Sequence, residues 1–333
     1  MIEVKGLVKR YGSHTAVENL SFTVETGQVY GFLGPNGAGK STTMNMITGC
    51  ISATEGQVLI DGHDIFEEPL LAKRQIGYLP EIPPLYVDFS VREYLKFVCQ
   101  LKGLKKAEVK PEIERVLEKA DIADVADRLI RTLSKGYRQR VGLAQALVGD
   151  PAIIILDEPS IGLDPKQIIQ MRELIRSLGR EHTVILSSHI LSEVSEVCDH
   201  ILIIKKGKLI GNGTPEELAA KMQTGTTLTV EVMGDENLIR EALSDIEGEI
   251  KVNAAATAGN YIVEITTPEQ SDLRSAVSIA LSAKGLVILS MNLAQASLED
   301  VFLELTYGDA ELPSDDDSEE DAENTEESEV DAE

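Results

Sequence analysis

A glycine-rich run that ends in lysine and serine carries the strongest chemical signal in the sequence. The run fits the pattern G-x-x-x-x-G-K-[ST] and comprises Gly34, Pro35, Asn36, Gly37, Ala38, Gly39, Lys40, Ser41 and Thr42. Glycines let successive backbone N–H groups point at phosphate oxygens, and a following helix adds its positive N-terminal end. Lys40 would supply charge to the β- and γ-phosphates, and the Ser41 hydroxyl would bind Mg²⁺. The pattern therefore predicts a site for a nucleoside triphosphate.

Two carboxylates follow an apolar run farther along the chain. The run 152–156 ends in Asp157 and Glu158, which would place Asp157 at the carboxyl edge of a buried parallel strand, where such sheets bind ligands. Asp157 would hold Mg²⁺ through a water, and Glu158 would take a proton from the water that attacks the γ-phosphate. Two acids in an ordinary turn are the alternative, which the nearby phosphate loop disfavours.

A histidine stands at the end of a third apolar run. His189 follows residues 184–188, and an imidazole at that edge could donate a hydrogen bond and hold the attacking water in line. We therefore predict a catalytic role for His189. The other four histidines have no comparable sequence context.

The segment 133–140 offers a second anion site. Ser134 and Gly136 precede a predicted helix, and a serine hydroxyl with a glycine N–H at a helix start can bind an anion. An ordinary helix N-cap at Ser134 explains the same residues. Because the chain already has a complete phosphate loop, the residues alone leave both readings open.

The elements that must position these groups indicate an α/β fold. Apolar strand-like runs alternate with helical stretches over residues 1–220, which is typical of a mainly parallel sheet covered on both faces. Short alternating pieces predict a small antiparallel β subdomain, and helical spacing predicts an inserted helical subdomain at about 82–145. Residues 225–306 follow the order β-α-β-β-α-β of a C-terminal α+β ferredoxin-like module, with a short helix around 298–305.

Composition and charge narrow the classes of function. No apolar run approaches the roughly 20 residues that span a bilayer, and the sequence opens without a signal-peptide pattern, which predicts a cytoplasmic protein. The net charge is −25, and residues 309–333 contain 14 Asp or Glu and no Lys or Arg. Such a tail is predicted to be disordered and is most simply a solubilising appendage. The acidic balance disfavours nucleic acid as a partner.

Taken together, these motifs resemble the nucleotide-binding subunit of ABC transporters over residues 1–220. The resemblance implies a P-loop ATPase core that uses ATP and Mg²⁺. It implies that Ser134 and Gly136 contact the γ-phosphate of ATP bound to the opposite subunit, and that Asp164 lies in the loop that links the two sites. Tyr11 matches the aromatic residue that stacks on adenine.

Two positions depart from the usual family pattern. The signature segment has Lys135 and Tyr137 where the family usually has glycine and glutamine. Glu81 replaces the loop glutamine that normally approaches Mg²⁺ and the attacking water. A carboxylate can still reach the metal, but it cannot donate a hydrogen bond.

The narrower resemblance is to ATP-binding subunits of bacterial exporters for drugs, polysaccharides or gliding motility. It implies a second ATP-binding subunit, with a homodimer expected, and an integral membrane permease encoded separately. The chain would then be peripheral at the cytoplasmic face of the membrane. A groove near residues 83–89 would accept a helix of the permease. A soluble ABC-type ATPase acting as a regulatory switch is the alternative function, and the role of residues 225–306 stays open.

Overall fold

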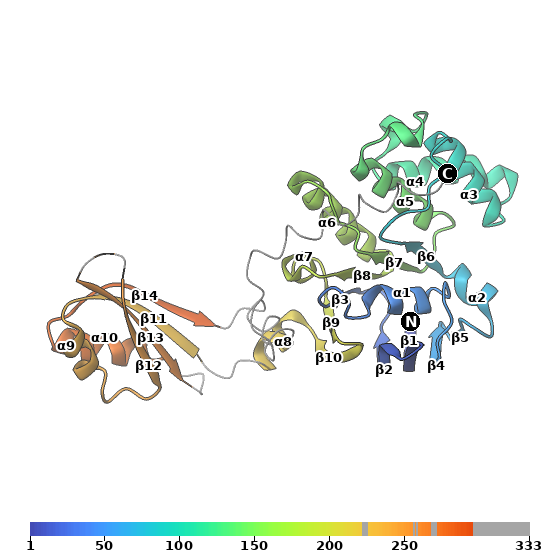
Figure 1. Ribbon diagram of the computed structural model, residues 1–333. Helices are drawn as coiled ribbons and strands as arrows, with labels where there is room; N and C mark the ends of the chain where they lie inside the picture. The colour runs from blue at the N-terminus through green and yellow to red at the C-terminus, as the bar shows by residue number, and fades with distance from the viewer. Residues whose placement is uncertain (222–225, 256, 258, 268–271, 296–333) are drawn as a thin grey trace, which may run out of the picture.

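The computed structural model describes residues 1–221, 226–255, 257, 259–267 and 272–295 (Figure 1). Their strands form three sheets, of which two belong to the first 213 residues and one to the C-terminal part of the chain. The predicted helix around 298–305 and the acidic tail 309–333 lie outside the described residues.

The largest sheet has six strands in the order β10-β9-β3-β8-β7-β6. All neighbours pair in parallel except the antiparallel edge strand β10. The strands are β3 (Val29–Leu33), β6 (Ile76–Leu79), β7 (Ile153–Asp157), β8 (Thr183–Ser188), β9 (His200–Lys205) and β10 (Lys208–Gly213). Both β3 and β7 are buried along their whole length, as the continuous apolar runs predicted.

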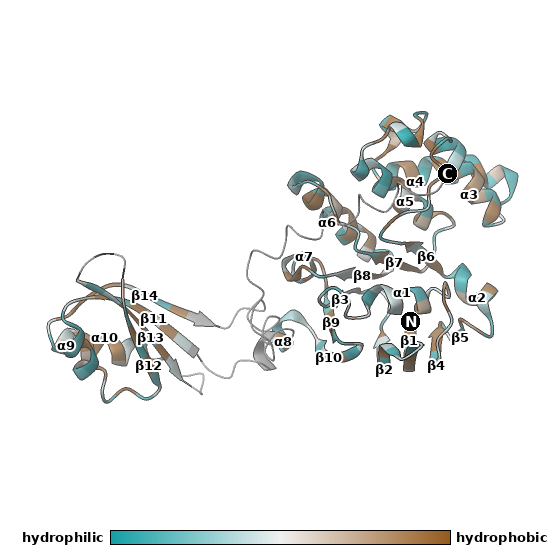
Figure 2. Cartoon of the chain, in the orientation of Figure 1, coloured by the Kyte–Doolittle hydropathy of each residue, from teal (hydrophilic) through white to brown (hydrophobic). Residues whose placement is uncertain are grey.

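Two hydrophobic cores lie on opposite faces of this sheet. Along β7, Ile153 and Ile155 belong to one core, while Ile154 and Leu156 belong to the other, because successive side chains of a strand point to opposite faces. Helices cover one face and the other packs on a small sheet, so the apolar strands run through the interior (Figure 2). The helices on that face include α5 (Lys135–Leu147), α6 (Pro165–Gly179), α7 (Leu191–Ser195) and α8 (Pro215–Lys221), whereas α1 (Lys40–Ile47) packs in the other core, together with the small sheet.

The small sheet is antiparallel and has the order β2-β1-β4-β5. Its strands are β1 (Ile2–Tyr11), β2 (His14–Val24), β4 (Glu55–Ile60) and β5 (His63–Asp64), and the short helix α2 (Pro69–Arg74) follows them. The predicted fold class is therefore confirmed: a mainly parallel sheet lies beside a small antiparallel one.

A helical layer is inserted between β6 and β7 in the sequence, although the two strands are neighbours in the sheet. It comprises α3 (Val91–Leu101), α4 (Lys106–Lys119), two 3₁₀ turns (Ala123–Val125 and Ile130–Thr132) and α5. Ser90 and Glu93 form a reciprocal capping box at the start of α3, which satisfies two otherwise unpaired N–H groups. The side chains that α3 buries recur at helical spacing, and they are Val91, Tyr94, Leu95, Val98 and Cys99.

The C-terminal part forms an antiparallel sheet with its own hydrophobic core. Its elements are β11 (Thr226–Met233), α9 (Glu236–Ala242), β12 (Glu249–Ala254), β13 (Asn260–Thr267), α10 (Arg274–Ala283) and β14 (Val287–Gln295). The strand order β12-β13-β11-β14 places the fourth strand beside the first and the third between the first and second. This is the arrangement of a ferredoxin-like module. The division at 1–220 and 225–306 stays a prediction.

No helix among the described residues is both long enough and apolar enough to cross a bilayer.

Because the C-terminal sheet has its own core, a substitution in that core should destabilise the C-terminal part without affecting the six-stranded sheet. Leu228 is 1% exposed and belongs only to the core of the C-terminal sheet, so Leu228→Ala is expected to cost roughly 2–5 kcal/mol there. Hydrogen exchange should speed up in residues 226–295 and stay unchanged in β3, β7 and β8. Thr229→Ala, one residue on and facing the other side of the sheet, is the control and should change neither. Equal loss of protection in both parts would contradict two independent cores.

Candidate functional site

The phosphate loop joins the buried strand β3 to α1, and close contacts require glycine at two of its positions, Gly34 and Gly39. Gly39 begins the helix with φ at 101°, a conformation that side chains disfavour. A Cβ on Gly39 would lie 2.5 Å from the Ala16 carbonyl oxygen, and one on Gly34 would lie 2.4 Å from that of Ile204. The loop can therefore approach its neighbours, and a ligand, only as bare backbone.

Lys40 extends back over this loop and is almost fully buried. Its Nζ donates to the carbonyl oxygens of Gly34 at 2.8 Å and Pro35 at 3.3 Å. The same Nζ lies 3.2 Å from Glu158 Oε1, and the two side chains are only 6% and 9% exposed. A buried ammonium is thus held between backbone oxygens and one carboxylate, which is the environment a phosphate oxygen could share.

Asp157 ends β7 and receives hydrogen bonds from two serines. Ser187 Oγ donates at 2.5 Å and Ser41 Oγ at 3.3 Å, both to Asp157 Oδ1. Burial raises the pKa of the Asp157 carboxyl, although the two serine hydrogen bonds oppose this shift. A cation beside the carboxylate would restore the ionised form.

The donor set fits Mg²⁺. The hydroxyl of Ser41 and the carboxylate of Asp157 converge from two elements, and Mg²⁺ prefers such oxygen ligands together with water and phosphate. Among the described residues, no three His, Cys, Asp or Glu side chains could hold a metal ion by themselves. Direct coordination by Glu81, which we predicted from the sequence, stays a prediction.

Glu158 is held from several directions in a strained conformation. Its φ is 46°, in the left-handed region that non-glycine residues rarely adopt. The Glu158 N–H donates to Ser187 Oγ at 2.9 Å. His189 Nδ1 lies 3.0 Å from Glu158 Oε2, a hydrogen bond that requires the proton on Nδ1. These contacts leave the carboxylate with little freedom to turn away from the site.

Lys40, Ser41, Glu158 and His189 line a cavity of about 630 Å³, whereas Asp157 lies behind Ser41 and is not part of its wall. Its wall includes most of the residues predicted from the sequence, together with three that were not, His14, Ala16 and Ile161: Tyr11, His14, Ala16, Asn36, Gly37, Gly39, Lys40, Ser41, Thr42, Glu81, Glu158, Ile161 and His189. Tyr11 is 51% exposed, and Lys9 Nζ lies 5.0 Å from its ring centroid. An exposed aromatic face at the cavity rim could stack on a flat base.

Ser134, Gly136 and Asp164 lie outside this cavity. Ser134 is the exposed N-cap of α5 and accepts from the Tyr137 N–H at 3.4 Å. Asp164 is the N-cap of α6 and accepts from the Gln167 N–H at 2.9 Å. The two helix starts are neighbours, because a Cβ on Gly136 would lie 2.5 Å from Gln167 Oε1. One chain therefore does not bring Ser134 to its own Lys40.

Ser187 is a functional candidate that our sequence reasoning missed. It is fully buried and joins the Asp157 carboxylate to the Glu158 backbone. The position follows from strand register, since Ser187 pairs with Asp157 across β8 and β7. The hydroxyl of Ser187, two residues before His189, could have been noticed, but its partner could be inferred only once the order of strands was known.

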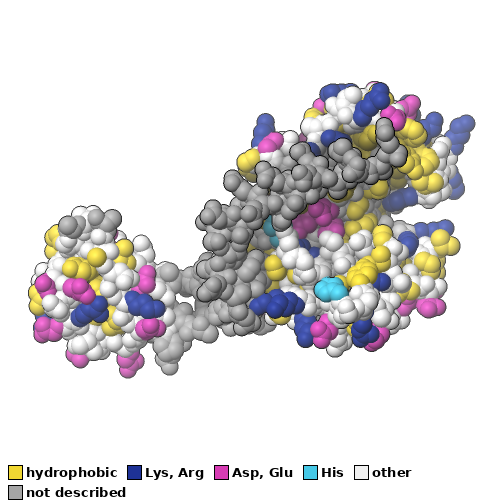
Figure 3. Space-filling view, in the orientation of Figure 1, with side chains coloured by type: hydrophobic (Ala, Val, Ile, Leu, Met, Phe, Trp, Pro, Cys, Tyr) yellow, Lys and Arg dark blue, Asp and Glu magenta, His cyan; other side chains and the backbone are white. Residues whose placement is uncertain are grey.

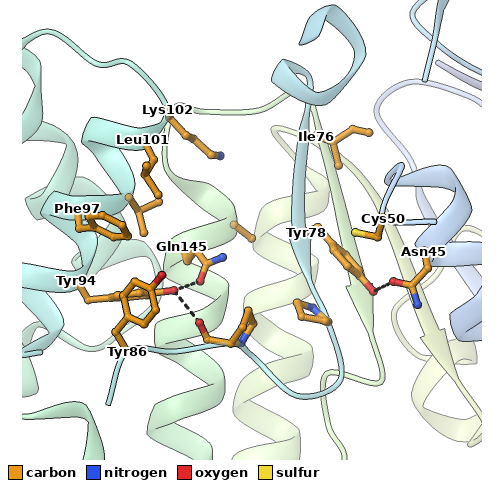
Figure 4. Close-up of a pocket in the computed structure, with 14 residues that line it drawn as sticks. Asn45, Cys50, Ile76, Tyr78, Tyr86, Tyr94, Phe97, Leu101, Lys102 and Gln145 are labelled. Carbon is orange, nitrogen blue, oxygen red and sulfur yellow. Dashed lines mark hydrogen bonds between the residues drawn. The ribbon is translucent and has the colours of Figure 1, made fainter. Parts of the chain in front are cut away.

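A second cavity of about 640 Å³ lies beside the helical layer (Figure 4). Aromatic side chains from the loop before α3 and from α3 itself form one wall, and residues of α1 and β6 form the other. Tyr86 packs against Phe89, Tyr94 and Phe97 with ring centroids 5.4–6.0 Å apart. Across the cavity, Tyr78 donates a hydrogen bond to Asn45 Oδ1 on α1 at 3.2 Å.

The two cavities share structural elements. Asn45 lies on α1, the helix that begins with Lys40, and Tyr78 belongs to β6, which leads to Glu81. Burial raises the pKa of Tyr78, so the phenol stays protonated and able to donate. We call this second cavity the aromatic cavity. A molecule bound in it would therefore contact α1 and β6, two elements that also position residues of the phosphate site.

Comparison with known proteins gives consistent matches. The family model described as ABC transporter matches residues 17–161. The bacitracin transport ATP-binding protein BcrA of Bacillus licheniformis is 35% identical over 312 residues, which cover 92% of this chain and 98% of that protein. The Nod factor export ATP-binding protein I of Cupriavidus metallidurans is 34% identical over 92% of this chain and 97% of its own length.

A solved structure agrees in fold as well as in sequence. The dimeric post-hydrolysis state of an ATP-binding cassette bound to ADP and Pi superposes with a TM-score of 0.59 at 25% identity, covering 64% of this chain and 98% of that one.

We expect Ser187→Ala to lower ATP turnover about 5- to 50-fold while nucleotide binding changes less than threefold, because Asp157 and Glu158 lose their common hydrogen-bond partner. Steady-state ATPase rates and fluorescent-nucleotide titration measure the two effects. Thr183→Val removes a buried hydroxyl from the other end of the same strand and should leave turnover within twofold. Equal effects of the two substitutions would mean that Ser187 serves packing only.

We expect Glu81→Gln to keep ATP binding and to change turnover by less than tenfold, because the residue lines the cavity wall without contacting Lys40, Asp157 or Glu158 in any recorded bond. Turnover should be compared over a Mg²⁺ titration, since a carboxylate that reaches the metal would change the midpoint. A complete loss of hydrolysis would refute a supporting role.

Proposed function

The chain belongs to the ABC transporter family of ATP-binding proteins, and from this premise we propose that two copies enclose two ATP molecules and drive a separate membrane permease in export. The chain is an ATPase subunit, and subunits of this family dimerise and pair with membrane permeases. The buried Lys40–Glu158 pair at the end of the phosphate loop is the observation that carries the assignment of the catalytic residues.

Lys40, Ser41 and Asp157 are the residues we assign to phosphate and metal. The loop N–H groups of residues 34–42 and the start of α1 would bind the β-phosphate, and Lys40 would reach the β- and γ-phosphates. Ser41 and Asp157 would hold Mg²⁺, which neutralises phosphate charge as the bond to the leaving group breaks. Tyr11 would stack on the adenine ring.

Glu158 and His189 are assigned to the attacking water. Glu158 would accept a proton from that water, and His189 would hold the water in line with the γ-phosphate. The hydrogen bond between them supports this division, because it fixes the carboxylate and the imidazole in one orientation. Ser187 positions Glu158 through its backbone N–H.

The second subunit would complete each site. Ser134 and Gly136 at the positive start of α5 would bind the γ-phosphate held by the partner, and Asp164 would connect the two sites. Ser134 is exposed and lies outside its own chain's cavity, which supports a role toward another molecule. The similar cassette structure is dimeric and bound to ADP and Pi, which supports a nucleotide-bound dimer. We propose a homodimer.

The aromatic cavity is the surface we assign to the permease. Tyr86, which lines the cavity, is 54% exposed, and Phe89, which packs against Tyr86, is 38% exposed. Clustered exposed aromatic side chains mark interaction sites. A cytoplasmic helix of the permease in this groove would place the chain at the cytoplasmic face of the membrane. The hydrogen bond from Tyr78 to Asn45 offers a route from that helix to α1.

Export is the direction we propose, since one of the reported relatives is named for Nod factor export. The net charge of −25 supports a partner other than nucleic acid.

We expect Glu158→Gln to trap an ATP-bound dimer, because the substitution removes the water's proton acceptor while keeping the shape of the side chain. Size-exclusion chromatography with ATP and Mg²⁺ should show twice the monomer mass, and turnover should fall at least about 100-fold. Glu173→Gln, an exposed change on α6, should do neither. A variant that binds ATP and remains a monomer would contradict the enclosed dimer.

We expect Tyr86→Glu with Phe89→Glu to abolish co-purification with the permease while ATP binding changes less than twofold. Binding of the permease helix would bury both new carboxylates without partners of opposite charge. Leu85 is left unchanged because it is half-buried against the core, where a charge would destabilise the fold. Leu238→Glu with Ile279→Glu places the same charges on exposed apolar side chains of the C-terminal module as a control. Unchanged co-purification of the Tyr86 and Phe89 variant would contradict the assignment.

A further inference from the structure

A third cavity, of about 590 Å³, lies between α3 and α4. Leu104, Val109 and Ile113 are partly or fully buried and supply its apolar floor. Four basic side chains and one glutamine complete the lining: Arg92, Lys96, Gln100, Lys106 and Lys110. We call this set the basic groove. Lys and Arg side chains are numerous on the helical layer in Figure 3.

Three of the four cations in the basic groove have no partner of opposite charge among the recorded ion pairs of the described residues. Arg92 pairs with Glu114 and Asp127. No ion pair is recorded for Lys96, Lys106 or Lys110, and all three are exposed. By contrast, other cations of α4 are paired, as Arg115 is with Glu112 and Asp150 and Lys119 is with Glu181.

This local excess of positive charge stands out in an acidic chain. Residues 91–119 contain eight Lys or Arg and five Asp or Glu, whereas the chain as a whole has a net charge of −25. Three lysines around one groove repel each other unless an anion lies between them. An apolar floor with a cationic rim suits an occupant that combines apolar and acidic side chains.

The chain carries one segment with that composition. Residues 309–333 contain 14 Asp or Glu and no Lys or Arg, and Leu312 lies three residues before the start of the acidic run 315–317. The segment also has the reach. Thirty-eight residues follow Gln295, and an extended chain of that length spans on the order of 130 Å. A compact domain of 220 residues has a radius of gyration of only about 17 Å.

We propose that the acidic segment 309–333 binds in the basic groove of its own chain, with carboxylates against Lys96, Lys106 and Lys110 and Leu312 on the apolar floor. Each exposed ion pair is weak, but the covalent tether gives the segment a high effective concentration and lets several weak pairs act together. The interaction weakens as salt rises, because the charges are exposed.

The position of the groove gives this contact a consequence. Lys96 and Gln100 line the basic groove, while Phe97 and Leu101 on the same helix α3 line the aromatic cavity. The bound segment therefore lies against the helix that forms one wall of the permease surface. It adds an acidic layer next to that surface and reduces its attraction for anionic lipid headgroups.

Carbodiimide cross-linking of the full chain tests the contact directly, because this reagent joins amines only to carboxylates in contact. Mass spectrometry should find links from Lys96, Lys106 and Lys110 to residues 309–333 at least about fivefold more often than links from the exposed Lys166 and Lys206. At 0.5 M salt the groove links should fall several-fold, since screening shortens the Debye length to about 4 Å. Links spread evenly over all five lysines would overturn the proposal.

A matched pair of full-length variants separates the groove from general charge. The first variant is Lys96→Glu/Lys106→Glu/Lys110→Glu. It should raise the rate of hydrogen exchange in residues 309–333, and also in residues 92–113, which the bound tail is expected to protect. Arg74→Glu/Arg128→Glu/Arg180→Glu makes the same change in net charge on other exposed positions and should alter neither. If the groove variant fails to fold, Asp/Glu→Asn/Gln changes throughout residues 309–333 test the same contact from the other side.

Binding to lipid vesicles tests whether the basic groove binds anionic lipid or residues 309–333. With the tail intact, vesicles of zwitterionic lipid and of 30% anionic lipid should bind equally weakly, and neutralising the tail should raise binding to the anionic vesicles several-fold. Strong binding of the unmodified chain to anionic vesicles, lost in the groove variant while tail cross-links are absent, would overturn the proposal and assign the groove to lipid.

Discussion

The buried pair of Lys40 and Glu158 is the interaction on which the site depends. Opposite charges 3.2 Å apart, each less than a tenth exposed, are tolerated inside a protein only while they remain paired. In the proposed mechanism each also acts on the triphosphate, Lys40 on its oxygens and Glu158 on the attacking water. Ser187, His189 and the strained Glu158 backbone hold the carboxylate in place. The geometry that stabilises the pair is therefore also the geometry that orients the chemistry.

Much of this site could be predicted because its residues obey local rules. A glycine loop between strand and helix, and polar residues after apolar runs, mark the carboxyl edge of a parallel sheet from the sequence alone. Ser187 escaped prediction because its role comes from the pairing of β7 with β8, a long-range feature. His14 escaped because it reaches the cavity from the antiparallel sheet. In the C-terminal module the sequence predicted the order β-α-β-β-α-β, and the strand order β12-β13-β11-β14 agrees with a ferredoxin-like arrangement.

The structure keeps both readings of Ser134 that the sequence left open. Ser134 is an ordinary N-cap of α5, with its hydroxyl bonded to the Tyr137 N–H, and it is also exposed toward solvent. A capping hydroxyl and a positive helix start serve the fold and an anion equally well. What distinguishes the two roles is a partner, because no residue of the same chain's phosphate cavity lies at this helix start. The helix α3 likewise contributes to two sites, because its residues line the aromatic cavity and also the basic groove.

The central claim is that ATP held by Lys40 of one molecule is capped by Ser134 of another, and mixing two inactive chains tests it. In a Glu158→Gln background, Lys40→Ala and Ser134→Arg each destroy both sites of a homodimer, but a mixed dimer keeps one site with Lys40 and Ser134 intact. Analytical ultracentrifugation with labelled ATP should find no nucleotide-bound dimer for either variant alone and one retained ATP per dimer in the mixture. A Ser134→Arg chain that forms the ATP dimer alone, or a mixture that forms none, would contradict the account.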